Sequence, residues 1–261
     1  MSAVLILPEN TKGRDFVIGD IHGAFDMLEK ALAAAQFDAT RDRLISIGDL
    51  IDRGPESRRC AELLRQPWFF AVRGNHEDMF LDIVRADGTF DENKAAWNIR
   101  NGMGWIFDET PEMLSALRAE IARMPLALEI PTDRGTVGFV HAEVPAGLDW
   151  ETFKNKLAAG DEGVTEKALW GRDRIQAGDT SGVAGIDRLF FGHTPQAGGP
   201  QRLGNCYYID TGAVFRLLKG DADFFLTLSD IRADSAIIPG PGAREKVITQ
   251  TPPKPKKFGA Y

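Results

Sequence analysis

The chain is poor in cysteine, has no excess of basic residues and contains no long apolar run. Cys60 and Cys206 are its two cysteines; they allow at most one disulfide and form no Cys-x-x-Cys pattern. A disulfide-stapled secreted domain and a thiolate metal site are therefore not indicated. Against 38 Asp and Glu residues, the 31 Lys and Arg residues leave a net charge of −7. This balance argues against a surface for nucleic acid or for an anionic membrane.

Features that direct a chain to a membrane or out of the cell are also missing. No stretch approaches the ~20 apolar residues that a membrane span needs. The start, MSAVLILPEN, has a short apolar run but lacks the basic region and the long apolar region of a signal peptide. We therefore expect a cytoplasmic protein with no membrane partner and no nucleic-acid partner. The sequence gives no indication of its oligomeric state.

The first third of the chain repeats one pattern three times: a short apolar strand, a Gly-rich loop and a helix. The expected strands are 15–18, 43–47 and 68–72, and helical spacing of apolar residues follows each of them. Three such units predict a mostly parallel sheet. Residues 89–124 are expected to be helical, interrupted by NGMGW, and to form a packed cap or to shape a substrate groove. From Leu126 onward, short strands between Gly and Pro turns predict a second sheet packed on the first.

The composition changes near the end of the chain. Residues 236–261 are rich in Pro, Gly and Lys and show no periodicity. We expect an extended tail there. No internal repeat is found, and nothing indicates a second domain with its own core. Residues 1–235 are therefore expected to form one domain.

All four histidines of the chain lie in short motifs at the ends of expected strands, namely His22, His76, His141 and His193. Strand ends at the edge of a sheet are where ligands bind. With Asp20, Asp49 and Asn75, these motifs offer enough nitrogen and oxygen ligands for two metal ions.

A division of the ligands between two ions follows from their spacing. In an extended chain residues i and i+2 point the same way, so Asp20 and His22 can bind one ion. Asp49 can reach that ion with one carboxylate oxygen and a second ion with the other. Asn75 can join the second ion through its carbonyl oxygen. His141 and His193 can complete the second ion.

The ordered motifs resemble a known family. They are GDIHG (19–23), GDLIDRG (48–54), RGNHE (73–77), VHAE (140–143), GHTP (192–195) and IDTGAVF (209–215). This series resembles the metallo-dependent phosphoprotein phosphatases, most closely the compact bacterial and phage branch typified by bacteriophage lambda phosphatase. The resemblance covers about residues 14–230. It implies an α/β, calcineurin-like metallophosphatase fold, with two packed mixed β-sheets flanked by helices, and makes residues 1–235 the catalytic domain.

The resemblance also implies roles for the motif residues. Two divalent ions, Mn first with Fe or Zn as alternatives, would activate a water molecule that attacks phosphorus directly. His76 would be the general acid for the leaving group, and Asp52 would hold its ring in the right tautomer. Arg53, Arg73 and Arg172 would bind the phosphate, because a guanidinium makes paired contacts with phosphate oxygens. Arg174 is so close to Arg172 in sequence that either could supply the third arginine.

Three functions are weighed on this basis. The first is a phosphatase for phosphoserine and phosphothreonine, and also for phosphotyrosine, with phosphorylated proteins or peptides as partners. The second is a dinucleoside polyphosphate hydrolase of the same superfamily. Members of that branch often carry a non-acidic residue in place of Asp52 and GNHD in place of GNHE, so Asp52 and Glu77 favour the first function. The third is a binding module that has lost catalysis, for which a ligand or the acid would have to be missing.

Overall fold

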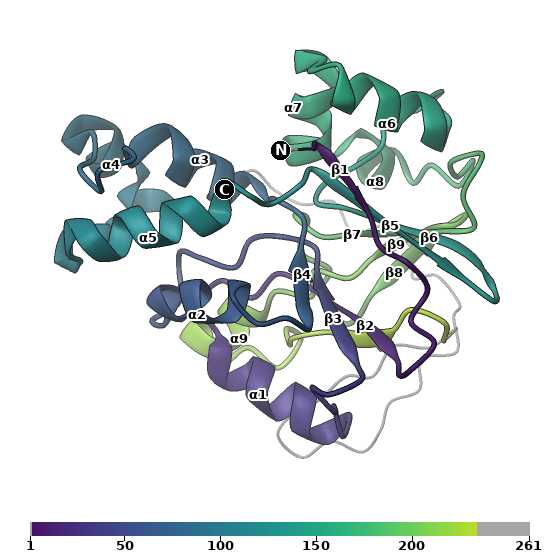
Figure 1. The fold of residues 1–261 in the computed structure, drawn as a ribbon, viewed down its shortest axis with the longest axis horizontal. Helices are drawn as coiled ribbons and strands as arrows, with labels where there is room; N and C mark the ends of the chain where they lie inside the picture. Colours follow the sequence, from purple (N-terminus) through teal and green to yellow (C-terminus); the bar gives the residue numbers. More distant parts are fainter. Residues whose placement is uncertain (1, 234–261) are drawn as a thin grey trace.

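Two β-sheets pack face to face, and helices cover the outer side of each sheet (Figure 1). The computed structural model describes residues 2–233. The tail predicted for 236–261 lies outside these residues. Within the described part of the chain, no helix is long and apolar enough to cross a membrane.

The sheet nearer the N-terminus contains the three predicted strands. β2 (Asp15–Ile18), β3 (Arg43–Ser46) and β4 (Phe69–Ala71) are parallel. β10 (Leu228–Asp230) adds to β2 in the antiparallel direction, giving the order β10-β2-β3-β4. We expected the segment that contains β10 to belong to the second sheet, and this was wrong. The parallel strands are mostly buried on both faces, which explains why they are continuous apolar runs.

The second sheet is mixed and has six strands in the order β1-β5-β6-β7-β9-β8. β5 pairs antiparallel with β6, and β6, β7 and β9 run parallel. β1 pairs parallel with β5 at the edge and was not predicted as a strand. The strand bounds are Val4–Ile6 (β1), Ala127–Thr132 (β5), Gly135–Val140 (β6), Arg188–Phe191 (β7), Gln201–Leu203 (β8) and Cys206–Tyr208 (β9).

Helices flank the two sheets on opposite sides. The first sheet is covered by α1 (Phe25–Ala34), α2 (Cys60–Leu64), α3 (Asn75–Ile83) and α5 (Pro111–Ile121). The second sheet is covered by α6 (Trp150–Ala158), α7 (Glu162–Trp170) and α8 (Asp173–Ala177). The other helical segments are η1 (Ser57–Arg59), α4 (Glu92–Asn98), η2 (Ile99–Asn101), η3 (Met103–Asp108) and α9 (Ala213–Lys219). The three helices predicted in the first third are confirmed as α1, η1 with α2, and α3.

The helical cap predicted for residues 89–124 is also confirmed. Its interruption at NGMGW runs from the end of η2 into η3, and Gly102 between the two helices has a φ of 92°. A side chain is strained in that left-handed conformation, so a glycine suits this turn. The turn redirects the chain toward the loop after β3, because the Gly102 carbonyl accepts a hydrogen bond from the Arg53 backbone N–H at 3.2 Å.

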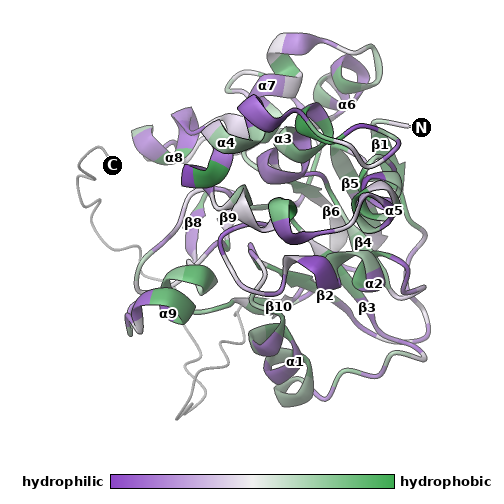
Figure 2. Cartoon of the chain, turned by 90° about the vertical axis from the view of Figure 1, so that its left-hand side faces the viewer, coloured by the Kyte–Doolittle hydropathy of each residue, from purple (hydrophilic) through white to green (hydrophobic). Residues whose placement is uncertain are grey.

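The contact between the two sheets is apolar and tightly packed. Val17 and Ile45 from the first sheet meet Phe139 and Phe190 from the second, and all four are buried. Phe139 and Phe190 stack with their ring centres 5.7 Å apart. Figure 2 shows both hydrophobic and hydrophilic residues on the helices, and β8 at the edge of its sheet is largely hydrophilic. Each such buried side chain contributes on the order of 1.5–3 kcal/mol to folding, and together they hold the two sheets face to face.

Candidate dinuclear metal site

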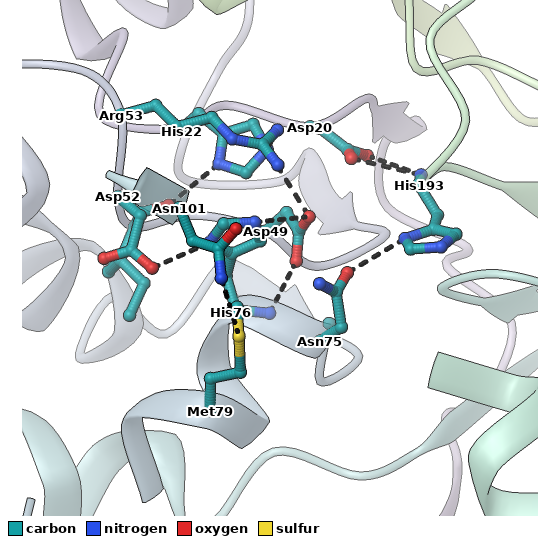
Figure 3. A network of polar contacts seen from close by, with 12 residues as sticks. Asp20, His22, Asp49, Asp52, Arg53, Asn75, His76, Met79, Asn101 and His193 are labelled. Atoms are coloured by element: carbon teal, nitrogen blue, oxygen red, sulfur yellow. Dashed lines mark hydrogen bonds and ion pairs between the residues drawn. The ribbon is translucent and has the colours of Figure 1, made fainter. Parts of the chain in front are cut away.

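The site lies where the carboxyl ends of strands from both sheets meet (Figure 3). The loops after β2 and β3 and the start of α3 after β4 supply one set of polar residues. The loops after β6 and β7 supply His141 and His193. The six residues predicted to bind metal are all buried and all lie in these segments: Asp20, His22, Asp49, Asn75, His141 and His193. The structure therefore brings the predicted ligands together from both halves of the chain.

The backbone of the site is strained. Among residues 2–233, six non-glycine residues have a positive φ, and five of them belong to the predicted site. They are His22 (45°), Asp49 (52°), Asp52 (71°), Arg53 (67°) and His193 (66°). Such conformations cost of order 1–3 kcal/mol each and persist only where neighbouring contacts impose them. Strain concentrated in this way indicates that the fold holds these side chains in place for a function.

Glu77 is one source of that constraint. Its carboxylate accepts backbone N–H bonds from Asp49 at 2.8 Å, from Leu50 at 2.7 Å and from Gly74 at 2.9 Å. Burial and the nearby Asp49 raise the pKa of Glu77 to about 7. A side chain on Gly74 would come within 2.3 Å of the Asp49 carboxylate, so this close approach requires glycine. Glu77 thus connects the loop after β3 to the start of α3, a positioning role that the sequence analysis missed.

The two oxygens of Asp49 face two separate groups of side chains. Asp49 Oδ2 lies 3.4 Å from His22 Nε2 and 4.0 Å from His76 Nε2. Asp49 Oδ1 lies 3.4 Å from His141 Nε2, in a group that also contains His193. The ligand atoms within each group are close enough to hold one ion. This is the geometry expected of a carboxylate that two ions share.

The charge of Asp49 suits that role. Burial opposes ionisation of its carboxyl group, but the nearby histidines His141, His76 and His22 outweigh burial, and the pKa of Asp49 is lowered. An ionised carboxylate among imidazole nitrogens is a ligand set that binds divalent metals.

His22 is held in the tautomer that binds metal. Its Nδ1 lies 2.9 Å from the carbonyl oxygen of Ile51, which can only accept a hydrogen bond, so the proton is on Nδ1. Arg53 Nη1 lies 2.7 Å from His22 Nε2 and can only donate, so Nε2 carries the lone pair. Burial and the Arg53 charge lower the pKa of His22. The ring is therefore neutral and presents Nε2 toward Asp49.

In the group of Asp49, His141 and His193, a cation would relieve the repulsion between lone pairs that face each other. His141 Nδ1 lies 2.8 Å from the Ile47 carbonyl and donates to it, so the neutral ring presents the lone pair of Nε2. That lone pair lies 2.8 Å from Asn75 Oδ1, and His193 Nδ1 lies 2.9 Å from the same oxygen. Burial lowers the pKa of both His141 and His193, which favours their neutral forms. The lone pairs of His141 Nε2 and Asn75 Oδ1 face each other and repel unless a cation lies beside them, and His193 Nε2 is buried without a hydrogen-bond partner in the described structure, so the residues fit a metal ion.

Asp20 is placed differently from the other predicted ligands. Its carboxylate is buried and accepts the backbone N–H of His193 at 3.1 Å, and it belongs to neither group around Asp49. Burial and the neighbouring carboxylates of Asp210 and Asp49 raise the pKa of Asp20. Nearby cations would relieve that repulsion. The ligand role of Asp20 stays a prediction.

His76 and Asp52 form the predicted pair. His76 Nδ1 lies 2.7 Å from Asp52 Oδ2, and both side chains are buried. Burial lowers the pKa of His76, but Asp49 and Asp52 together outweigh burial and raise it. A raised pKa keeps a proton on the ring near neutral pH, as a general acid requires. The second oxygen of Asp52 accepts a hydrogen bond from Trp105 Nε1 at 2.7 Å, a contact that the sequence analysis did not anticipate.

The predicted phosphate-binding arginines differ in their freedom. The Arg53 side chain contacts the group around Asp49 Oδ2 through its hydrogen bond to His22. Arg73 makes long contacts of 3.4 Å to Asp78 and to the Met124 carbonyl, and its Nε is buried without a partner in the described structure. Arg172 is exposed, and burial of part of its side chain together with the charge of Arg53 lowers its pKa.

The structure separates Arg172 from Arg174. Arg174 is fully buried, and its side chain donates to the Val144 carbonyl at 2.6 Å and to Asp179 at 2.7 Å. Its backbone N–H donates to Glu143 at 3.0 Å. Arg174 therefore stabilises the fold beneath the loop, and Arg172 is the residue of the pair that can meet a ligand.

Comparison with known proteins agrees with this geometry. The model of the calcineurin-like phosphoesterase family matches residues 16–197, and the chain belongs to this family. It is therefore a hydrolase, a metallophosphoesterase. The family implies a dinuclear divalent metal site, and the two His/Asp groups that share Asp49 are consistent with one.

Individual relatives carry different activities in their names. Serine/threonine-protein phosphatase 1 of Salmonella typhimurium is 40% identical over 205 residues, which cover 77% of this chain and 87% of the relative. The symmetrical bis(5'-nucleosyl)-tetraphosphatase of Shewanella baltica strain OS155 is 30% identical over 145 residues, or 55% of this chain and 49% of the relative. A crystal structure of a protein provisionally assigned as a diadenosine tetraphosphatase has a TM-score of 0.63 at 20% identity, and the match covers 91% of this chain and 97% of that one. This last likeness shows the fold alone.

Proposed function

We propose that the protein is a metal-dependent serine/threonine protein phosphatase, of the branch typified by bacteriophage lambda phosphatase, that also accepts phosphotyrosine. The observation that supports this most directly is the pair of His/Asp groups on the two oxygens of Asp49, beside a buried His76–Asp52 pair. A phosphomonoesterase needs both features: positive charge for the phosphoryl group and a proton for the leaving oxygen. The relative named as a protein phosphatase, 40% identical over most of both chains, supports a phosphorylated protein or peptide as substrate.

The ligands divide between two divalent ions, for which Mn²⁺ is our first choice and Fe or Zn are alternatives. Asp20, His22 and Asp49 would hold one ion. Asn75, His141 and His193 would hold the other, with Asp49 shared. When bound, the ions supply an activated water molecule and offset the charge on the phosphate oxygens.

The remaining residues act on the substrate. His76 donates a proton from Nε2 to the leaving oxygen, while its Nδ1–H stays bound to Asp52. Arg53, Arg73 and Arg172 neutralise the phosphate oxygens. Because each of these arginines contacts phosphate in the ground state as well as in the transition state, each contributes to substrate binding.

A hollow beside the site favours a peptide over a polyphosphate. It has a volume of about 350 Å³ and lies between α7 and Asp78 of α3. Its charged lining residues are all acidic, namely Asp78, Glu162 and Glu166. Its wall includes Trp170, whose ring meets that of the site residue His193 with 5.9 Å between centres. Carboxylates repel a polyphosphate chain but tolerate a neutral or basic peptide.

The second candidate function is hydrolysis of dinucleoside polyphosphates. It is favoured by the relative named as a tetraphosphatase, which matches about half of this chain. That function uses the same metal ligands, so only the substrate distinguishes the two candidates.

A substrate panel tests the proposal. The protein is loaded with Mn²⁺ and assayed with a phosphoserine peptide, a phosphotyrosine peptide, an aryl phosphate and a dinucleoside tetraphosphate. We expect kcat/KM for the peptides and the aryl phosphate to exceed that for the tetraphosphate by at least about tenfold, or ~1.4 kcal/mol. The reverse ranking by the same factor would assign the protein to the dinucleotide hydrolases.

A cytoplasmic location completes the proposal. Cys60 and Cys206 are both buried free thiols, which suits a reducing compartment.

A further inference from the structure

The segment NGMGW, residues 101–105, runs from the end of η2 into η3 and contacts Asp52 and Arg53, which lie three and four residues after the predicted shared ligand Asp49. Trp105 Nε1 donates to Asp52 Oδ1 at 2.7 Å, while Asp52 Oδ2 lies 2.7 Å from His76 Nδ1. The Gly102 carbonyl accepts the backbone N–H of Arg53 at 3.2 Å. A side chain at Gly102 would come within 2.3 Å of the Arg53 backbone nitrogen. The cap thus contacts the proposed acid pair through Trp105, and it contacts Arg53, proposed to bind phosphate, through Gly102.

Trp105 is itself fixed by the helix that carries His76. Its ring stacks on Phe80 with 5.9 Å between centres and 1° between planes. Phe80 is fully buried on α3, one turn after His76. Asn101, the last residue of η2, also contacts Met79 of α3 (Figure 3). Asp52, Trp105 and His76 therefore lie on three segments that are packed against one another.

Asp52 needs such support. It is fully buried, with a φ of 71°, and its carboxylate would be free to rotate if only His76 held it. An indole N–H can only donate, so Trp105 fixes one carboxylate oxygen and leaves the other for the imidazole. The backbone N–H of Asp52 donates to Ser57 Oγ at 2.9 Å, which holds the main chain but not the carboxylate.

We propose that Trp105 is a positioning residue for proton donation: by holding Asp52 Oδ1, it sets the orientation in which Asp52 Oδ2 aligns His76 with the leaving oxygen. This inference rests on the role given to His76 under the proposed function. It assigns the helical cap to the leaving-group side of the reaction, in addition to shaping a groove.

The test is the dependence of rate on the leaving group. Trp105→Phe keeps an aromatic ring to stack on Phe80 and removes the N–H. With a phosphoserine peptide, whose alkoxide needs a proton, kcat should fall by roughly tenfold to a hundredfold, a part of the ~10²–10⁴ that general acid catalysis supplies. With 2,4-dinitrophenyl phosphate, whose leaving group needs none, kcat should change by less than about twofold on the same reasoning. KM for both substrates and the bound metal should stay unchanged.

Two controls separate positioning from general damage. Trp97→Phe alters another tryptophan of the cap, which is 67% exposed and has the Arg100 guanidinium over its ring. This variant should leave both rates unchanged. Thermal unfolding checks that each variant is folded. Trp105→Leu, which has no hydrogen-bond donor in its side chain, serves as a second variant and should show the same split between substrates.

A double-mutant cycle with Asp52→Asn locates the effect. If Trp105 acts through Asp52, then Trp105→Phe should cause no further loss in the Asp52→Asn background. Additive losses, or an equal loss for both substrates in Trp105→Phe alone, would overturn the inference. If Asp52→Asn itself slows both substrates equally, the acid assignment under the proposed function is wrong, and the inference falls with it.

Discussion

The two halves of the site are held by different means. The half from the first sheet comes from three consecutive strand ends, and contacts among the loops of that one sheet fix it: the Glu77 carboxylate accepts hydrogen bonds from three backbone N–H groups, and the backbone at His22 and Asp49 is strained. The half from the second sheet consists of His141 and His193, which come from separate strands. Their position relative to Asp49 depends on how the two sheets pack. The first half is thus held within one sheet, and the second half depends on the core between the two sheets.

Substitution at the junction of the halves should have the largest effect. Asp49→Asn removes the charge that both groups share, so both ions should be lost. Activity should fall by well over ~100-fold, the upper range for losing a residue that only supports a metal ligand. Metal content per chain and kcat measure this. Asp26→Asn, at an exposed position of α1, is the control and should bind two ions. Retention of one tightly bound ion in Asp49→Asn would show that the two groups do not depend on a shared ligand.

Within the first half, His76 should separate catalysis from metal binding. His76→Asn should lower kcat for a phosphoserine peptide by roughly 10²–10⁴ while both ions stay bound. His193→Asn should instead lose the second ion. His76 lies in the group around Asp49 Oδ2, at the longer distance of 4.0 Å. If metal content falls with activity in His76→Asn, His76 is a ligand and the acid assignment is wrong.

The dependence of the second half on packing can be tested in the core. Phe139 lies on β6, the strand that ends before His141, and Phe139→Ala should open a cavity between the sheets and lower the free energy of unfolding by about 3–5 kcal/mol. The affinity for one of the two ions should fall, because the two sheets no longer hold their ligands at a fixed spacing. Phe16→Ala removes a ring of similar burial from the core between the first sheet and its helices. Metal titration of both variants should show a loss of metal affinity in Phe139→Ala only. An equal loss of affinity in both variants would show that the two halves of the site do not differ in this way.

The smallest effects should come from the arginines proposed to bind phosphate. Arg172→Ala should raise KM by about tenfold and weaken inhibition by inorganic phosphate, because the contact exists in the ground state. Arg53→Ala should do the same. Arg174→Ala is the informative contrast: it removes buried hydrogen bonds to Val144 and Asp179, so it should lower stability instead of phosphate affinity. Unchanged phosphate inhibition in Arg172→Ala would remove that residue from the site.

The same contrast explains what could be predicted from the sequence. The strands ending at Ile18, Ser46 and Ala71 and the predicted ligands after them follow a local pattern of apolar run and polar turn, which periodicity detects. β10 could not be assigned to its sheet, because pairing of residue 228 with residue 18 is a tertiary choice that no local pattern encodes. β1 was missed for the same reason.

The supporting residues were harder to find than the ligands. Trp105 reaches Asp52 across 53 positions of sequence, and its local context reads only as a break in a helical cap. Glu77 is visible in the motif RGNHE, but its bonds to Asp49 and Leu50 depend on how two loops meet. Strain is equally invisible, since the positive φ of Asp49 or His193 is imposed by the surrounding fold.

One measurement tests the shared-carboxylate site most directly. The protein is freed of metal with a chelator, and Mn²⁺ is added back while bound metal per chain and phosphatase activity are recorded together. We predict no activity without metal, two ions bound per chain at saturation, and activity that returns only as the second site fills. Full activity in the metal-free protein, or full activity at one ion per chain, would contradict the account.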